Sequence, residues 1–408
     1  MPHNRLVHSG IFVMILMVVI FPFYSIPAIA QDGTPEPEDP NLPLRVWWPD
    51  ALYPEGNRDT IDGIFAEFSS IYNLDLRYYV HTVGNDVPRL QLTHDIAPDA
   101  TPDLMLMRRE DMVRAARDNL IVPVDGWVPA STIAGASENL LALGEVDEVL
   151  YGVPYMLDLH HMLYNTSVFD TPPDSFEAVS GAEGLLTFPG QPRTGETVSD
   201  LVLVSYLASG GEFVGPEGEP VLDEPALRTV LEFFATTVTN EVISTDLLAY
   251  AAPANYWDQI IAAETDIALV NSSLYLSQRD DVPPEFDIVT LPSPDGTPTT
   301  LADAWFWVLT TTDPQRQEEA QRFLLWVMET DRLADMSMML DTIPSQQRAL
   351  RVLDDPYIDE MSNLLPVALY VEGRNNAAAA ALQQAFEAVL NGTPPDEATA
   401  AALERVSP

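Results

Sequence analysis

The feature that most constrains the fold of this chain is the segment 150–173, LYGVPYMLDLHHMLYNTSVFDTPP. It contains two apolar runs, and the first is interrupted by Gly152 and Pro154. Because Pro154 fixes φ and lacks a backbone donor, the segment cannot form one continuous helix. We therefore predict an extended segment that crosses from one compact unit to another, with a hinge and a cleft beside it.

The charge of the chain excludes several classes of function. The 408 residues include 62 acidic and 19 basic side chains, all of the latter arginine, and the formal net charge is −43. Such a surface repels phosphate backbones and disfavours nucleic-acid binding. The absence of lysine excludes Schiff-base and P-loop chemistry, because both need an amine. Solubility or adaptation to salt accounts for the acidic charge, and attraction of a cationic ligand is the alternative.

The N-terminus has the pattern of a targeting segment. An arginine precedes an apolar run over residues 11–23, and an A-x-A cleavage motif ends at Ala30. We predict that residues 1–30 are a cleaved signal peptide. A retained N-terminal anchor is the alternative, because the apolar run is close to the length that spans a bilayer. Residues 31–42 are acidic and proline-rich, and we expect a disordered leader there. Both alternatives place the rest of the chain outside the cytoplasm.

The hydrophobic periodicity of the next residues predicts an α/β organisation. In this part of the chain we expect strands at 44–48, 74–80, 103–107 and 120–124, and helices at 57–72 and 110–119. Alternating strands and helices predict parallel βαβ units with helices on both faces of the sheet. The length of the whole chain fits about two or three domains.

The order of the later elements predicts that the chain returns to its first unit. Farther along we expect helices at 199–208, 224–240, 255–263, 314–330 and 376–390, and strands at 266–270, 286–291 and 304–310. A helix-rich unit thus separates the first strands from the last ones. We predict two discontinuous lobes, 43–156 plus 304–341 and 157–303 plus 342–408. Their crossovers lie near 150–173, 299–307 and 341–345.

Several segments carry a pattern of apolar and turn residues in a fixed order. They are the YG-x-P…YN…F…PP pattern of 150–173 and the segments 205–218, 255–273, 311–327, 341–350 and 389–397. Together they resemble the family 1 extracellular solute-binding proteins of ABC importers, the group that contains the maltose-binding proteins. The resemblance implies an α/β, two-lobed periplasmic-binding-protein-like fold of type II, with discontinuous lobes and a hinge of two to three segments.

The resemblance also implies a function. The protein would be the extracytoplasmic solute-binding component of an ABC importer, a monomer without cofactor. It would bind a sugar or oligosaccharide in the interlobe cleft by hinge closure and deliver it to a membrane permease. The chain has no cysteine, which excludes disulfides, thiolate catalysis and the lipobox that anchors many members to lipid.

Common enzyme motifs do not occur in the sequence. We find no G-x-S-x-G, H-E-x-x-H, Walker A or G-x-G-x-x-G pattern. His160 and His161 are adjacent and point to different faces, so we expect structural or cleft-lining histidines rather than metal ligands. We predict that the protein is not an enzyme. The alternatives are a secreted carbohydrate-active hydrolase, with its acid pair hidden among many carboxylates, and a non-catalytic envelope protein that kept the fold.

Ligands of open α/β sheets bind beyond the carboxyl ends of the strands, where we place the first candidate site residues. Trp48 and Asp50 leave the first strand. We expect Trp48 rather than Trp47 to be exposed, with core packing as the alternative. Arg108 follows the strand 103–107, where its fork either binds a hydroxyl or carboxylate or forms a surface ion pair.

The crossover segments supply further candidates. Asp158 and His160 are polar residues within an apolar segment, which indicates either a ligand contact or a satisfied internal hydrogen bond. Asn271 and Tyr275 follow the strand 266–270, where the resembling family commonly places ligand contacts.

Two tryptophans complete the predicted site. Trp305 and Trp307 lie two residues apart and point the same way on an extended segment. We expect one of them to stack on the face of a sugar from the hinge side, and the alternative is that both are core residues. The predicted ligand-binding residues are therefore Trp48, Asp50, Arg108, Asp158, His160, Asn271, Tyr275, Trp305 and Trp307.

Overall fold

The computed structural model describes residues 43–369 and 374–406, and the predicted signal peptide and leader lie outside this range. Its strands are β1 (Leu44–Pro49), β2 (Leu76–His81), β3 (Leu104–Arg108), β4 (Glu145–Val146), β5 (Val149–Leu150), β6 (Gly152–Asn165), β7 (Leu186–Thr187), β8 (Ile267–Asn271), β9 (Phe286–Val289), β10 (Thr300–Leu309), β11 (Ile343–Pro344) and β12 (Ala368–Leu369).

The α-helices lie between these strands, singly or in groups. They are α1 (Arg58–Tyr72), α2 (Asp86–Ile96), α3 (Arg109–Arg117), α4 (Ala130–Ile133), α5 (Glu138–Ala142), α6 (Phe176–Ser180), α7 (Asp200–Ala208), α8 (Glu224–Thr239), α9 (Trp257–Ile261), α10 (Ser272–Gln278), α11 (Pro314–Val327), α12 (Thr330–Met339), α13 (Gln347–Leu353), α14 (Pro356–Leu364), α15 (Ala377–Leu390) and α16 (Pro395–Val406). Short 3-10 turns join several of them.

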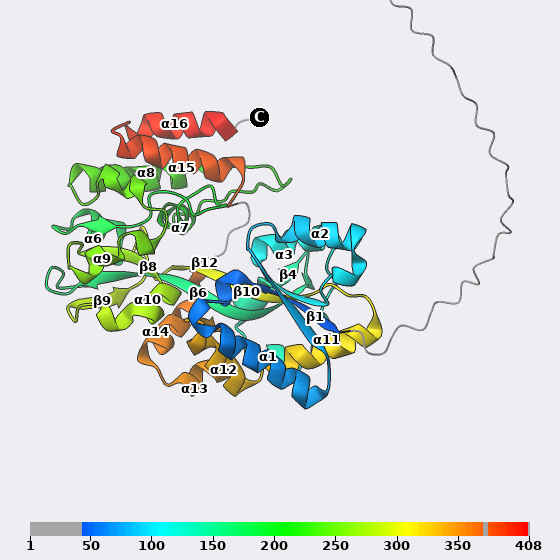
Figure 1. Ribbon diagram of the computed structural model, residues 1–408. Coiled ribbons are helices and arrows are strands. Elements are labelled where there is room, and N and C mark those ends of the chain that lie inside the picture. Colours follow the sequence, from blue (N-terminus) through cyan, green and yellow to red (C-terminus); the bar gives the residue numbers. More distant parts are fainter. Residues whose placement is uncertain (1–42, 370–373, 407–408) are drawn as a thin grey trace, which may run out of the picture. The chain divides into compact units, whose positions relative to one another are not determined.

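A ten-stranded sheet runs through the described part of the chain. Its order is β2-β1-β3-β10-β6-β8-β7, with β9 and β11 paired to β6 and β12 paired to β10. Strand β1 is parallel to β2 and β3, which confirms the predicted parallel units. Strand β10 is antiparallel to both β3 and β6, and β6 is antiparallel to β8. Two long central strands therefore join the first parallel unit to the second set of strands (Figure 1).

Two hydrophobic cores cover the two faces of the first half of the sheet. Core I contains Trp48 and Leu106 and is closed by α1, α11 and α12. Core II contains Trp47 and Met107 and is closed by α2, α3 and α14. Because both faces are covered, both tryptophans of β1 are buried, and the expectation that Trp48 is exposed is wrong.

Two further cores cover the second half of the sheet. Core III contains alternate residues of β8, such as Ile267 and Leu269, and is closed by α6, α7, α8, α15 and α16. Core IV contains Ala268 and Val270 from the other face of β8, together with Trp257 of α9. Helices α8, α15 and α16 lie side by side over core III (Figure 1).

The strands β6 and β10 each pass from one pair of cores to the other. The first residues of β6 enter core I, and Met162 and Tyr164 near its end enter core III. Strand β10 starts with Leu301 in core III and ends with Leu309 in core I. These strands correspond to the crossovers predicted near 150–173 and 299–307.

The third crossover, at which the chain passes from core II to core III, lies later in the chain than the predicted 341–345. Ile343 of β11 and Ala368 of β12 both belong to core II, whereas Leu369 packs against core III. Helix α15 then contributes Ala378 to core III. The packing therefore changes sides at β12, and the predicted lobe boundaries stay a prediction.

Two local expectations differ from the structure. Residues 120–124 do not form a strand, because only Val122 makes an isolated bridge, to Leu309. The helix expected over 314–330 ends at Val327, and a second helix, α12, begins at Thr330. None of the described helices combines the length and apolar character that a membrane span needs.

A buried ion pair ties β3 to α11. The Asp103 carboxylate accepts hydrogen bonds from Arg316 Nε at 2.6 Å, from Arg316 Nη2, and from the backbone N–H of Arg45 at 2.8 Å. Asp103 is fully buried, so its charge depends on these donors.

We therefore expect Asp103→Ala to lower the free energy of unfolding by about 3–5 kcal/mol, because it leaves the guanidinium of Arg316 without its carboxylate. Urea denaturation followed by circular dichroism measures this change. The matched control is Asp118→Ala at an exposed position, where the change should stay within about 0.5 kcal/mol. Equal effects of the two substitutions would contradict the assignment.

Candidate solute-binding site

A pocket with a volume of about 430 Å³ lies between cores II and III. One wall is α3, whose buried side belongs to core II. The other wall is formed by residues 374–376, which lead into α15, and by Val214, Gly218 and Pro220 between α7 and α8. Pockets of about 300–1,000 Å³ suit small ligands. This larger pocket thus has room for a small solute that contacts both halves of the fold.

A second, smaller pocket shares part of this lining. Its volume is about 30 Å³, and Arg109, Glu110 and Arg374 line both pockets. Arg108 and Asp303 complete the polar part of its wall. A space of this size holds about one water molecule or one small polar group.

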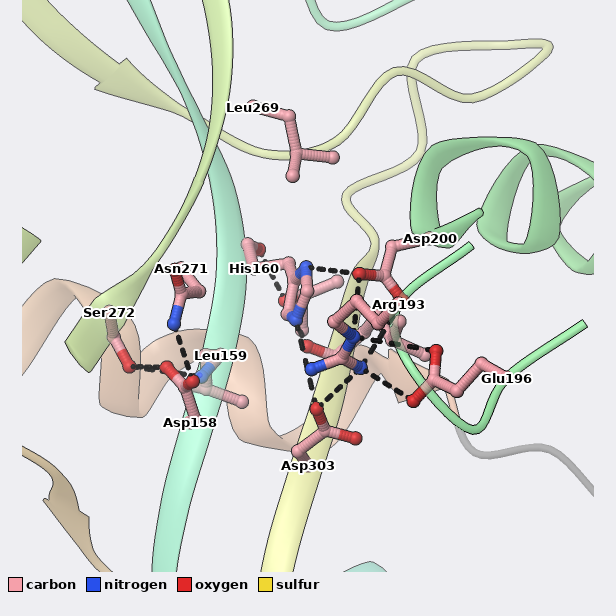
Figure 2. Close-up of polar contacts among 12 residues, drawn as sticks. Asp158, Leu159, His160, Arg193, Glu196, Asp200, Leu269, Asn271, Ser272 and Asp303 are labelled. Carbon is pink, nitrogen blue, oxygen red and sulfur yellow. Dashed lines mark hydrogen bonds and ion pairs between the residues drawn. The ribbon is translucent and has the colours of Figure 1, made fainter. Parts of the chain in front are cut away.

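Asp303 stands at the centre of a buried charge cluster beside the smaller pocket. It belongs to β10, and its carboxylate accepts a hydrogen bond from Arg193 Nη2 at 2.8 Å (Figure 2). Arg374 Nη1 lies 3.4 Å from the same carboxylate, and Arg108 Nη1 lies 3.8 Å from it. Burial acts to raise the pKa of Asp303, but these arginines, Arg193 first, hold it well below its usual value. Asp303 is therefore ionised at neutral pH.

Two further acids complete the cluster. Asp200, the first residue of α7, accepts a hydrogen bond from Arg374 Nη2 at 2.9 Å, and Arg193 Nε lies 3.3 Å from it. Glu196 accepts a hydrogen bond from Arg374 Nη2 at 2.7 Å. Burial raises the pKa of Glu196 to about 7, and the neighbouring Asp200 adds to this shift, while the arginines oppose it. Within the cluster, Glu196 is the acid that changes charge near neutral pH.

Three predicted site residues lie at this cluster. Arg108 stacks over the ring of Trp305 with its Cζ atom 5.1 Å from the ring centroid. Trp305 is buried in core I, so it supports Arg108 rather than presenting a free aromatic face. His160 is buried, and its ring nitrogens lie 3.8 Å from Asp200 and 4.0 Å from Asp303 (Figure 2).

Asp158 and Asn271 form a separate polar group. Asp158 accepts a hydrogen bond from Asn271 Nδ2 at 2.6 Å and another from the Ser272 hydroxyl at 2.9 Å (Figure 2). The backbone N–H and hydroxyl of Ser273 also donate to it, at 2.9 and 3.0 Å. The structure therefore satisfies Asp158 internally, the second of the two interpretations that its sequence context allowed. Sequence reasoning missed both serines.

The remaining predicted residues lie elsewhere. Trp48 and Trp307 are buried together in core I, with ring centroids 5.8 Å apart. Asp50 is exposed after β1 and accepts a hydrogen bond from the Val83 N–H at 3.4 Å. Tyr275 packs against the rings of His161 and Tyr357. None of these predicted residues lines the two pockets, and their role in binding stays a prediction.

The structure also brings together charged residues that sequence reasoning did not single out. They are Arg193, Glu196, Asp200, Asp303 and Arg374. Asp303 carried a readable signal, because it is the one charged residue in the apolar strand TLADAWFWVL. Among the described residues, no group of three or more histidine, aspartate or glutamate side chains is arranged to hold a metal ion.

A family model for bacterial extracellular solute-binding proteins matches residues 89–360. Because this match covers well over half of the chain, the protein belongs to that family. No curated protein sequence gives a significant match.

Solved structures with similar folds come from several bacteria. They include the cyclic alpha-maltosyl-1,6-maltose binding protein of Arthrobacter globiformis, with 19% identity, a TM-score of 0.69, and 89% of this chain and 97% of that chain covered. The maltose-bound MalE protein of Listeria monocytogenes shares 13% identity, with a TM-score of 0.69 over 90% and 97% of the two chains. A putative oligosaccharide periplasmic-binding protein of Synechococcus shares 12% identity, with a TM-score of 0.71 over 88% and 97%. These similarities confirm the predicted two-lobed periplasmic-binding-protein-like fold.

His161 gives a pH-dependent prediction. Its Nε2 atom forms a hydrogen bond with the Tyr357 hydroxyl at 3.0 Å. Burial lowers the pKa of the ring from 6.5 to about 4. Because the pKa of His161 is lower in the folded state than in the unfolded state, burial of the neutral ring contributes fully to stability above pH 6.5. This contribution is lost as the pH falls toward 4 and the unfolded chain binds the proton.

Between pH 7 and pH 4 we expect the wild type to lose about 3 kcal/mol more unfolding free energy than His161→Phe, which has no titrating ring. Urea titrations at each pH measure the difference. His94→Phe, at an exposed ring, should follow the wild type. The same pH dependence in His161→Phe and wild type would refute the prediction.

Proposed function

We propose that the protein is the extracytoplasmic solute-binding component of an ABC importer, and that it binds a sugar or oligosaccharide between its lobes and delivers it to a membrane permease. The family match is the observation that carries the proposal. The names of similar solved proteins, which bind maltose and related saccharides, support a sugar as the solute. We propose further that the chain is exported by its N-terminal segment and acts as a monomer.

The position of the larger pocket supports binding by hinge closure. One wall is α3, whose buried face belongs to core II, and the other wall includes residues 374–376, which lead directly into α15 of core III. Strand β10, which passes from core III to core I, lines the smaller pocket that shares residues with the larger one. A solute that contacts both walls binds the closed arrangement more tightly than an open one, and this differential affinity is what drives closure.

The carboxylates near the pockets support binding without turnover. Hydrolysis of a glycoside needs one carboxyl group that donates a proton and a second that acts as base or nucleophile. Glu110 is the one carboxylate among the described residues that line the larger pocket. The smaller pocket adds Asp303 beside Glu110, but its volume of about 30 Å³ holds about one water molecule and is too small for a sugar ring. The proposal is therefore a binding protein rather than a hydrolase.

The test is calorimetric titration and thermal unfolding of the mature protein with a panel of mono- and oligosaccharides. We expect at least one saccharide to stabilise the protein, by about 2.7 kcal/mol at a concentration a hundred times its Kd, with no product in the recovered ligand. Release of a hydrolysed product would favour the secreted hydrolase. The absence of any stabilisation across the panel would contradict the assignment to sugars.

A pocket variant locates the binding site. Val113 lies on α3 and lines the larger pocket, so Val113→Trp places a large side chain in it. We expect this variant to weaken saccharide binding at least tenfold, or about 1.4 kcal/mol. Val352→Trp at an exposed position outside the pocket is the matched control and should bind like the wild type. Unchanged binding by Val113→Trp would place the solute elsewhere.

A further inference from the structure

The charge of the larger pocket is opposite to that of the protein. Four of the 19 arginines line it, namely Arg109, Arg114, Arg117 and Arg374. Of the 62 acidic residues, Glu110 is the one that lines it among the described residues. Four guanidinium groups against one carboxylate give the described lining a formal charge of +3, whereas the whole chain carries −43. A lining with the average composition of the chain would instead carry a net negative charge.

The arginines of α3 are placed to meet a solute rather than to form the core. Arg109 is the first residue of α3 and donates hydrogen bonds to the backbone carbonyls of Leu143 and Glu145. Arg114 reaches Asp111 only at 3.7 Å, with its side chain 62% exposed. At this separation and with an exposed guanidinium the pair contributes little, so the Arg114 guanidinium remains available to a ligand.

The smaller pocket adds an independent observation. The Nε atoms of Arg108 and Arg374 are buried and have no hydrogen-bond partner among the described residues, and both arginines line this pocket. Arg374 is only 4% exposed. A buried donor without an acceptor is costly, more so when it is charged. A ligand oxygen atom that enters the smaller pocket would satisfy such a donor. The larger pocket adjoins this space, because Arg109, Glu110 and Arg374 line both pockets.

We propose that the solute is an anionic saccharide, one that carries a carboxylate or an ester-linked sulfate or phosphate. The inference rests on the proposed function and names the class of its ligand. The arginines of α3 hold the acidic group, because the planar guanidinium fork pairs with two oxygens of a carboxylate or oxyanion at once. A ligand oxygen in the smaller pocket accepts from Arg374. The sugar ring fills the rest of the larger pocket.

A structural role for the same arginines makes a different prediction. Arg114 and Arg117 lie in the last turn of α3, where a cation interacts favourably with the helix dipole. In that case binding would be indifferent to the charge of the saccharide. Arg405 occupies the same position in the last turn of α16 and does not line either pocket, so it serves as the matched control.

The experiment compares saccharides that differ only in charge. The probes are a trigalacturonate and its fully methyl-esterified form, and N-acetyllactosamine 6-sulfate and unsulfated N-acetyllactosamine, each titrated into the mature protein by calorimetry. We expect the charged member of at least one pair to bind at least tenfold more tightly. The pair that shows the difference identifies the carboxylate or the ester as the recognised group.

Variants then assign the preference to the pocket. We expect Arg114→Gln together with Arg117→Gln to abolish the preference for the charged member, and Arg405→Gln to keep it. Arg114→Lys together with Arg117→Lys retains the charge without the fork and should keep part of the preference, which distinguishes the loss of charge from a folding defect in the glutamine variant. Preference that survives the folded glutamine variant would overturn the assignment to α3.

The two levels of the hypothesis fail in different ways. Neutral members that bind as tightly as charged members overturn the anionic solute and leave the proposed saccharide-binding function intact. If no saccharide of either charge binds, both proposals fail.

Discussion

The carboxylate of Asp303 is the group on which the junction between the two halves of the sheet depends. It sits on β10, a strand that belongs to both halves, and three arginines reach it from different elements. Arg108 comes from the end of β3, whereas Arg193 and Arg374 precede α7 and α15. Because a buried carboxylate is costly without its partners, the charge is tolerable only while these elements stay assembled around the strand. The cluster therefore fixes how three distant segments meet.

The ion pairs of Arg374 are shorter to residues of its own half of the fold than to α3 of the other half. Arg374 contacts Glu196 and Asp200 at 2.7 and 2.9 Å, and Asp200 begins α7, which packs in core III. By contrast, Arg374 lies 3.9 Å from Glu110 of α3, which packs on core II. Coulomb energy falls with distance and with exposure to water, so the contact between halves is the weaker one. On the proposed hinge motion, the short contacts would persist while this one breaks. A solute that binds both Arg374 and α3 would then replace the weak contact between Arg374 and Glu110 with stronger contacts across the two halves.

Sequence periodicity was sufficient for most of the fold, because β1, β3 and α1 each carry a clear apolar pattern. The first two crossovers could be predicted from the sequence, because Pro154 rules out a helix and the strand pattern returns near Trp305. Trp48 was misassigned because alternation along one strand does not reveal whether both faces of a sheet are covered. The charge cluster was out of reach for a different reason: Arg193 and Arg374 lie in irregular segments and are separated from Asp303 by 110 and 71 positions along the chain.

The pocket also decides between two interpretations of the acidic composition. If the negative charge served to attract a cationic ligand, the residues around the ligand would be expected to share it. The described lining of the larger pocket instead carries a formal charge of +3. At physiological ionic strength, exposed charges are screened beyond about 8 Å, so the remote acids do not set the field inside the pocket. The acidic surface therefore fits solubility or adaptation to salt, and on the proposed function the local arginines would select the solute. Arginine suits this task better than lysine would, because its weakly hydrated fork binds oxyanions at lower desolvation cost.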